Sequence, residues 1–289
     1  MTNKYVMWLT AVIVTAGTAL AVGAAPAVAT PAGEYAIFAQ CPYNNPEVEG
    51  CLVSRTESGE VKLGDSTVPI VRTQTLQGGL INEEPIGKML VAARNGETLS
   101  KTPQKVPGGL AGLVKCDEIT GSGLAEITER VLCETLFENG VTGVNATTEL
   151  AAPASAVHLN ELALKNEEGV ALTLPIKVKL ENPLLGSECY IGSNAHPITL
   201  ELTTGTSGTL KGKAGTFNDE AEGGIVENSG NTLVESNFAA PGVTGCGPLG
   251  LLDGIINAKL ELPASTGNKA VLNNTNFQAN AEIVAEHES

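Results

Sequence analysis

The chain has 289 residues, of which 42% are hydrophobic and only 3% aromatic, and its formal net charge is −15 at pH 7. So acidic a chain repels phosphate groups, which disfavours binding to nucleic acid or to an anionic membrane surface. The scarcity of aromatic side chains also argues against stacked sugar sites and membrane girdles.

The first 29 residues have the pattern of an export signal. Lys4 precedes an apolar, uncharged run from Val6 to Val22, and Ala27-Val28-Ala29 matches a cleavage site. We therefore predict a signal peptide at 1–29 and a secreted or extracellular protein, associated with the cell envelope, that begins at Thr30. An uncleaved N-terminal anchor is the alternative, because the apolar run is long enough to span a bilayer.

Beyond the signal, short runs of strand-forming residues alternate with turns rich in Gly, Pro and Asn. In the first part of the chain we expect strands at 34–40, 52–55, 60–63, 67–76, 88–94, 141–150 and 156–164. Many short strands at roughly regular spacing are typical of an antiparallel sandwich or barrel.

One segment follows a different period. Apolar residues recur at helical spacing between Gly123 and Gly140, at Leu124, Ile127, Val131, Leu132 and Leu136. This predicts one helix, carried by an insertion near 117–140.

In the second part we expect strands at 170–180, 189–192, 198–202, 224–227, 232–238, 260–262 and 270–283, a loop tip at 203–213 and a short helix within 249–256. The segment 170–180 alternates most clearly between apolar and polar residues, as a half-buried strand does. In the last strand we expect Val271, Phe277, Ala279, Ala281 and Ile283 to share one face.

A stretch of the sequence occurs twice. Asn145–Ser155 returns as Asn257–Ser265 with a gap of two residues, and weaker echoes precede and follow each copy. We interpret this as an internal duplication. The predicted fold is therefore mostly β, with duplicated sandwich or barrel-like halves at 30–168 and 169–289 and one inserted helix.

Six cysteines remain after the signal: Cys41, Cys51, Cys116, Cys133, Cys189 and Cys246. An even number in an exported chain predicts three disulfides. We favour the local set Cys41–Cys51, Cys116–Cys133 and Cys189–Cys246. The duplication suggests a rival in which Cys41 pairs with Cys116 and Cys51 with Cys133.

No local signature of catalysis, cofactor binding or metal binding is present. His158, His196 and His287 lack metal-ligand spacing, and there is no nucleophile elbow. Gly245–Gly250 matches a dinucleotide motif only by letter, since Pro248 and a cysteine interrupt it. The acidic loop Asn218–Gly224 lacks EF-hand spacing. We therefore predict no catalytic, cofactor-binding or metal-binding residues, and no cofactor.

Four segments carry a resemblance to known sequences, namely Tyr35–Pro42, Thr73–Gly79, Leu185–Ser193 and Ala240–Gly247. They resemble a group of uncharacterised exported proteins of actinobacteria. The resemblance covers most of the mature chain and implies export from a Gram-positive, high-GC source. It implies no activity and no site residue.

The sequence favours a structural or ligand-binding protein of the cell envelope or exterior that is not an enzyme, with an apolar small molecule or an envelope component as partner. The first alternative is an exported hydrolase of envelope lipid or glycan, which would require His158, Asp253 and nearby Ser or Glu to converge in one pocket. The second alternative is an envelope-embedded β-barrel, which would require long strands with an unbroken apolar outer face.

Overall fold

The computed structural model describes residues 30–83, 87–110, 143–218 and 224–289. The predicted signal peptide and the predicted helix near 117–140 lie outside these residues, together with Cys116 and Cys133. The same is true of residues 219–223, which form the centre of the acidic loop.

The described chain is mostly β. Its strands are β1 (Gly50–Leu63), β2 (Ser66–Ile70), β3 (Gln74–Glu83), β4 (Gly87–Ala92), β5 (Gln104–Lys105), β6 (Asn145–Leu150), β7 (His158–Leu159), β8 (Leu172–Glu181), β9 (Tyr190–Ile191), β10 (Ile198–Leu202), β11 (Thr206–Ser207), β12 (Leu210–Lys211), β13 (Thr216–Asn218), β14 (Val226–Glu235), β15 (Val243–Thr244) and β16 (Lys269–Asn280). The α-helices are α3 (Glu161–Asn166), α4 (Asp253–Leu260) and α5 (Ala281–Glu286), and the 3₁₀-helices are η1 (Gly33–Phe38), η3 (Ala154–Ala156) and η4 (Pro248–Gly250).

Fourteen strands form one large sheet whose main order is β13-β14-β16-β1-β3-β4-β7-β8-β6-β5. Every pairing between these strands is antiparallel. The prediction of a mostly β, antiparallel fold is confirmed. The order ends at β13 and β5, so the sheet is open and not a closed ring of strands.

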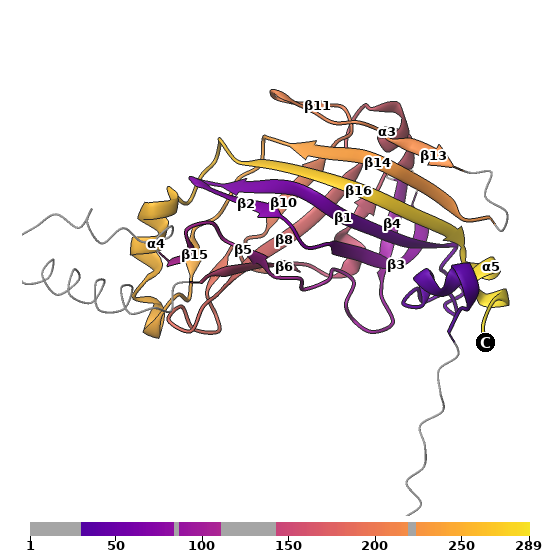
Figure 1. Cartoon of the computed structure of the whole chain (residues 1–289), viewed down its shortest axis with the longest axis horizontal. Helices are drawn as coiled ribbons and strands as arrows, with labels where there is room; N and C mark the ends of the chain where they lie inside the picture. Colours follow the sequence, from indigo (N-terminus) through magenta and orange to yellow (C-terminus); the bar gives the residue numbers. More distant parts are fainter. Residues whose placement is uncertain (1–29, 84–86, 111–142, 219–223) are drawn as a thin grey trace, which may run out of the picture.

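The sheet curves so strongly that its inner face surrounds the main hydrophobic core. Figure 1 shows β14, β16 and β1 as a layer that lies across β8, β10 and β6. Side chains from both layers share one core cluster, which includes Leu52, Leu90, Leu174, Leu200 and Leu233. The inner positions of β8 are therefore almost all apolar, as expected for a strand with one face in the core.

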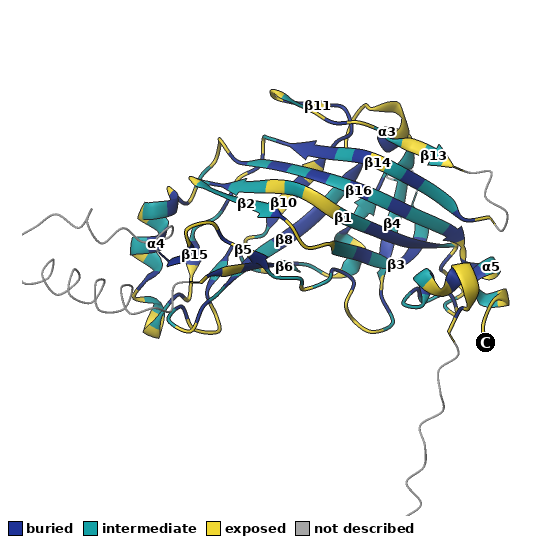
Figure 2. Cartoon of the chain, in the orientation of Figure 1, coloured by how far each residue is buried: buried dark blue, intermediate teal, exposed yellow. Residues whose placement is uncertain are grey.

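A second, smaller core covers the outer face of β1 and β16 near the described ends of the chain. Tyr35 and Phe38 from η1 pack there with Val53, Ala279 and Val284. Thr30 lies beside Ser289, whose amide donates to its carbonyl oxygen at 3.2 Å. In Figure 2 this region combines buried positions with exposed ones on η1 and α5.

The structure contains the disulfides Cys41–Cys51 and Cys189–Cys246. Both belong to the local set, and their presence excludes the rival pairing of Cys41 with Cys116 and of Cys51 with Cys133. The first disulfide lies in the smaller core, and the second lies in the main core.

Strands from the two predicted halves pair with each other. β1 pairs with β16 along most of its length, and β6 and β7 both pair with β8. The two copies of the repeated stretch also differ in conformation, because Asn145–Leu150 is β6 whereas Asn257–Leu260 forms the end of α4. The predicted strand at 260–262 is therefore wrong.

Several other predicted strands are helical for identifiable reasons. Segment 34–40 contains η1, because the three-residue spacing of Tyr35 and Phe38 buries both on one face of a 3₁₀-helix. Segment 156–164 is β7 followed by α3, since the Asn160 side chain accepts from the Ala163 amide as an N-cap. Asn280 likewise caps α5, so the predicted strand 270–283 ends before Ala281.

The other differences concern how strands are divided. The predicted strands 52–55 and 60–63 are one strand, β1, with an irregularity in register between Thr56 and Ser58. The predicted strand 67–76 is divided between β2 and β3. The expected loop tip at 203–213 contains the small β11–β12 hairpin.

Candidate functional site

The inner face of β16 changes its chemistry half-way along the strand. Side chains alternate between the two faces of a strand, so Ala270, Leu272, Asn274, Asn276 and Gln278 share the inner face. The first two belong to the main core, whereas the other three are amides. The inside of the sheet thus has an apolar end near α4 and an amide-rich end near α5 (Figure 1).

An apolar cavity of about 60 Å³ lies at the first end. Val61 and Val68 from the β1–β2 hairpin face Ile176 and Val178 from β8 across it, and Leu260 from α4 also contacts it. One water needs about 10–15 Å³ on this scale, so the space admits an apolar group of several atoms. Protein interiors are otherwise close-packed, which makes this space a candidate site.

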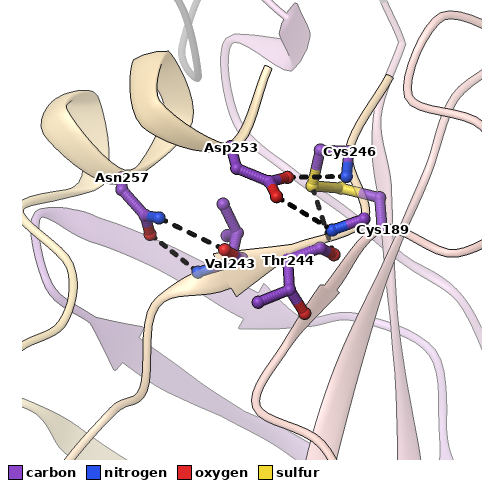
Figure 3. The surroundings of a disulfide bond; sticks show 7 residues. Cys189, Val243, Thr244, Cys246, Asp253 and Asn257 are labelled. Carbon is purple, nitrogen blue, oxygen red and sulfur yellow. Dashed lines mark hydrogen bonds between the residues drawn. A yellow bond between two sulfur atoms is a disulfide. The ribbon is translucent and has the colours of Figure 1, made fainter. Parts of the chain in front are cut away.

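Helix α4 covers this end, and two of its side chains fix its position. The carboxylate of Asp253 accepts from the Cys246 amide at 2.7 Å and from the Gly245 amide at 3.1 Å. The Asn257 side chain accepts from the Val243 amide at 2.7 Å and donates to the Val243 carbonyl at 3.2 Å. Figure 3 shows both side chains pointing from the helix toward this segment, beside the disulfide of Cys246.

The turn between β1 and β2 approaches the end of α4 closely. Asp65 donates its amide to the Leu260 carbonyl at 2.8 Å. Gly64 has φ +57°, and a Cβ there would lie 1.8 Å from the Leu260 oxygen. Glycine is therefore required at this position, and the contact holds Leu260 against the cavity.

Gln104 closes the side of the cavity between β2 and β5. Its side-chain oxygen accepts from the amides of Val71 and Arg72 at 3.0 Å, and its side-chain nitrogen donates to the Arg72 carbonyl at 2.6 Å. The side chain is 3% exposed. Because its side-chain amide is already hydrogen-bonded, Gln104 stabilises the wall of the cavity and does not contact a ligand. Few other polar groups line the cavity, and Ser66 and Thr148 are two of them.

A hollow of about 290 Å³ lies at the amide-rich end. Asn82 and Lys88 line it from β3 and β4, and Gln278 and Asn280 line it from β16. Asn274 and Asn276 continue the same inner row of β16 into the interior and are 3% and 7% exposed. The two ends of the sheet interior thus differ in the kind of group that they can accommodate.

The structure does not bring His158 and Asp253 together. His158 on β7 lies with its Nδ1 3.4 Å from Glu83 Oε2, and β7 pairs with β4. Asp253 belongs to α4, at the opposite end of the molecule from β4 (Figure 1). Neither residue lines the apolar cavity or the hollow.

The other candidates from the sequence also lie apart. His196 is exposed in a turn, where its amide donates to the Ser193 hydroxyl at 3.1 Å. His287 stacks on Tyr35 with ring centroids 4.0 Å apart. Gly245–Gly250 runs from the Cys246 disulfide into η4, and no helix opens at its first glycine as a dinucleotide site requires.

Sequence reasoning missed the row of inner amides. The face expected for the last strand, with Phe277 and Ala279, packs on the smaller outer core, and the alternate positions face the interior. The usable signal was Asn or Gln at every second position from Asn274 to Asn280 on a strand with apolar neighbours.

Comparisons with protein-family models, with curated proteins and with solved structures found no match to this chain. In the part of the chain that the structure describes, no group of three or more His, Cys, Asp or Glu could hold a metal ion. Within the same residues, no helix has the length and apolar character needed to cross a membrane.

Proposed function

We propose that this chain is an exported, disulfide-stabilised binding protein that holds an apolar group of a small ligand inside its curved sheet. The observation that carries the proposal is the apolar cavity between the β1–β2 hairpin and β8. Ligand sites are typically concave, mostly apolar and supplied with a few polar groups, and this cavity has that composition.

The walls of the cavity are held independently of any ligand. Gln104 joins β5 to the segment after β2, Asp253 and Asn257 hold α4, and the Cys189–Cys246 disulfide lies beside them. A site that is formed before binding loses less conformational entropy when the ligand enters. This supports a binding role over a purely structural one.

The placement of polar residues favours binding over hydrolysis. A hydrolase needs a nucleophile or activated water, a base and an oxyanion site close together. His158 and Asp253, the residues on which the hydrolase hypothesis rests, lie on separate elements: β7 pairs with β4, and α4 lies far from β4 in Figure 1. Asp253 also uses both carboxylate oxygens to position α4.

Export is supported by the two disulfides, because disulfides persist in oxidising compartments. Mass spectrometry of the non-reduced protein from its own culture medium tests this part of the proposal. We expect Thr30 at the N-terminus and a third bond between Cys116 and Cys133. An intact Met1, or free thiols, would contradict export with cleavage of the signal.

The binding role is tested with xenon, a neutral apolar atom that enters dry apolar cavities, by following the methyl groups of the isotope-labelled protein in an NMR titration. We expect saturable binding to the wild-type protein. Ala146→Leu fills the cavity, since Ala146 lines it and is 7% exposed, and should weaken binding about tenfold or more.

Ala152→Leu is the matched control, because it makes the same change outside the cavity in the same part of the chain. It should leave xenon binding unchanged. Thermal unfolding of both variants establishes that each is folded. Equal xenon binding by folded Ala146→Leu and wild-type protein would refute the proposed site.

A further inference from the structure

The amide-rich end of the interior contains buried polar groups that the fold itself does not require. Asn274 and Asn276 on β16 lie opposite Asn231 and Asn228 on β14 in the strand register. These four residues are 0–7% exposed. Burying an amide is costly unless its donors and acceptors are hydrogen-bonded, so the partners of each group are informative.

Asn228 is the centre of the cluster. Its side-chain oxygen accepts from the Asn231 side-chain nitrogen at 2.5 Å and from the Asn276 side-chain nitrogen at 3.2 Å. Its own nitrogen donates to the Ala214 carbonyl at 2.9 Å. The Oδ1 atoms of Asn231 and Asn274 have no hydrogen-bond partner among the residues that the structure describes. The cluster therefore contains two buried acceptors without a partner in the described part of the chain.

The hollow lies at the end of β16, on the same face of the strand as this row of side chains. Gln278 lines the hollow and lies two residues after Asn276, and Val226, its register partner on β14, lies two residues before Asn228. Same-face neighbours along a strand lie about 7 Å apart, so Asn276 is the nearest residue of the cluster, whereas Asn274 lies about 14 Å from Gln278 and outside the lining of the hollow.

The charged groups of the hollow are already paired. Lys88 Nζ lies 2.7 Å from Glu161 Oε1, and the Asn82 side chain donates to Glu49. A charged ligand would have to compete with these partners, and an apolar ligand would leave the neighbouring amides without bonds. A ligand with several hydroxyl groups both donates and accepts, as the Gln278 side chain does; the Asn280 oxygen caps α5, so this residue offers its side-chain nitrogen as a donor.

We propose that this hollow is a second binding site, for a neutral polyhydroxy ligand of the size of one sugar residue. Gln278, Asn280 and Asn82 contact its hydroxyls. Among the described residues, no aromatic side chain lines the hollow to stack on a sugar ring, so the expected Kd is weak, about 1 mM. The site is independent of the apolar cavity.

The test is an NMR titration of the isotope-labelled full mature protein with N-acetylglucosamine and with glucose, following side-chain and backbone amides. We expect saturable shifts at Asn82, Gln278 and Asn280 with at least one sugar. Gln278→Leu should bind about fivefold more weakly or worse, the effect of one lost neutral hydrogen bond. Thr275→Val, on the opposite face of β16, should bind as the wild type does.

Three outcomes would overturn the inference. The first is that neither sugar gives saturable shifts. The second is that the shifts map away from β16 and β3, or that Gln278→Leu binds as tightly as Thr275→Val. The third is that a neutral dipeptide, alanyl-alanine, saturates the site while both sugars do not, which would assign the hollow to peptide recognition.

Discussion

The two ends of the inner face of β16 differ in side-chain chemistry, although both are buried and belong to the same strand. At the end near α4, Ala270 and Leu272 sit in the main core, and a small apolar space remains beside them. At the other end, Asn274 and Asn276 are equally buried but bring polar atoms, and the oxygens of Asn274 and of its neighbour Asn231 lack partners among the described residues. Burial alone therefore does not set the chemistry of this interior.

The comparison indicates which substitutions should affect the stability of the fold and which should affect ligand binding. Apolar burial stabilises the fold in proportion to the area removed from water. Buried amides give little net stability, and an unsatisfied one lowers it. Substitutions at the apolar end should hence cost stability, whereas some at the amide end should cost only binding.

The largest expected effect concerns the disulfide beside α4. Replacing Cys189 and Cys246 by Ser opens a loop of 57 residues and should lower the free energy of unfolding by about 4 kcal/mol. The same change at Cys41 and Cys51, 10 residues apart, should cost about 3 kcal/mol. Urea denaturation of both double variants measures the difference, and the reverse order would contradict the account.

The next largest effect is expected when a polar side chain replaces an apolar one at the apolar end. Leu272→Asn places an amide among apolar side chains and should lower the free energy of unfolding by about 3 kcal/mol. Chemical denaturation measures the loss. Leu162→Asn, at a side chain that is 72% exposed, is the control and should change stability little. An equal loss in both variants would show that the apolar end is not specifically required.

The amide end supports a paired prediction. Asn228→Leu removes the acceptor of two side-chain amides and should lower the free energy of unfolding by about 2 kcal/mol. Asn274→Leu removes an oxygen that has no partner in the described residues, and should leave stability unchanged or raise it by about 1 kcal/mol.

Denaturation of the two variants side by side measures this pair. A loss at Asn274→Leu as large as that at Asn228→Leu would show that the Asn274 oxygen is bonded in solution, and the idea of a free acceptor would fail.

The smallest effect concerns the outer side of the amide end. Tyr35 is 1% exposed, and burial raises the pKa of its phenol above 10.0, with the carboxylates of Glu34 and Glu286 adding to the shift. The folded state therefore holds this proton more tightly than the unfolded chain does. The resulting stability is complete below pH about 10 and is lost as the pH rises through the raised pKa.

Tyr35→Phe should accordingly reduce the loss of stability above pH 10 and change little at neutral pH, since the hydroxyl has no partner among the described residues. The free energy of unfolding, measured from about pH 8 to pH 11, tests this. An unchanged alkaline loss in the variant would assign the effect to other groups.

The sequence predicted the class of fold and the most periodic strand well. Segment 170–180 alternates between a buried and a solvated face, and β8 has that arrangement. The short loop between Cys41 and Cys51 also favoured their pairing, because short loops close at low entropic cost, and Cys189–Cys246 followed as the pair that remained. The strand pattern and the Cys41–Cys51 pair depend on nearby residues, which a sequence displays directly.

The remaining features depend on tertiary contacts. Asn257–Leu260 resembles Asn145–Leu150 in sequence, yet Asn257 is drawn into a helix that bonds to Val243, whereas Asn145 lies on an exposed strand end. The set of alternate β16 side chains that faces inward also depends on the two cores that pack on opposite faces of the strand. Neither the cavity nor the amide cluster could therefore be located from the sequence, since both combine distant strands.

The most direct test of the central claim uses one methyl- and amide-labelled sample in two NMR titrations. Xenon should shift the methyl groups of Val61, Ile176 and Leu260 and leave the Gln278 amide unchanged. N-acetylglucosamine should shift the Gln278 and Asn82 amides and leave those methyl groups unchanged. If both probes shift the same atoms, or neither shifts any, the interior does not have two chemically distinct binding ends.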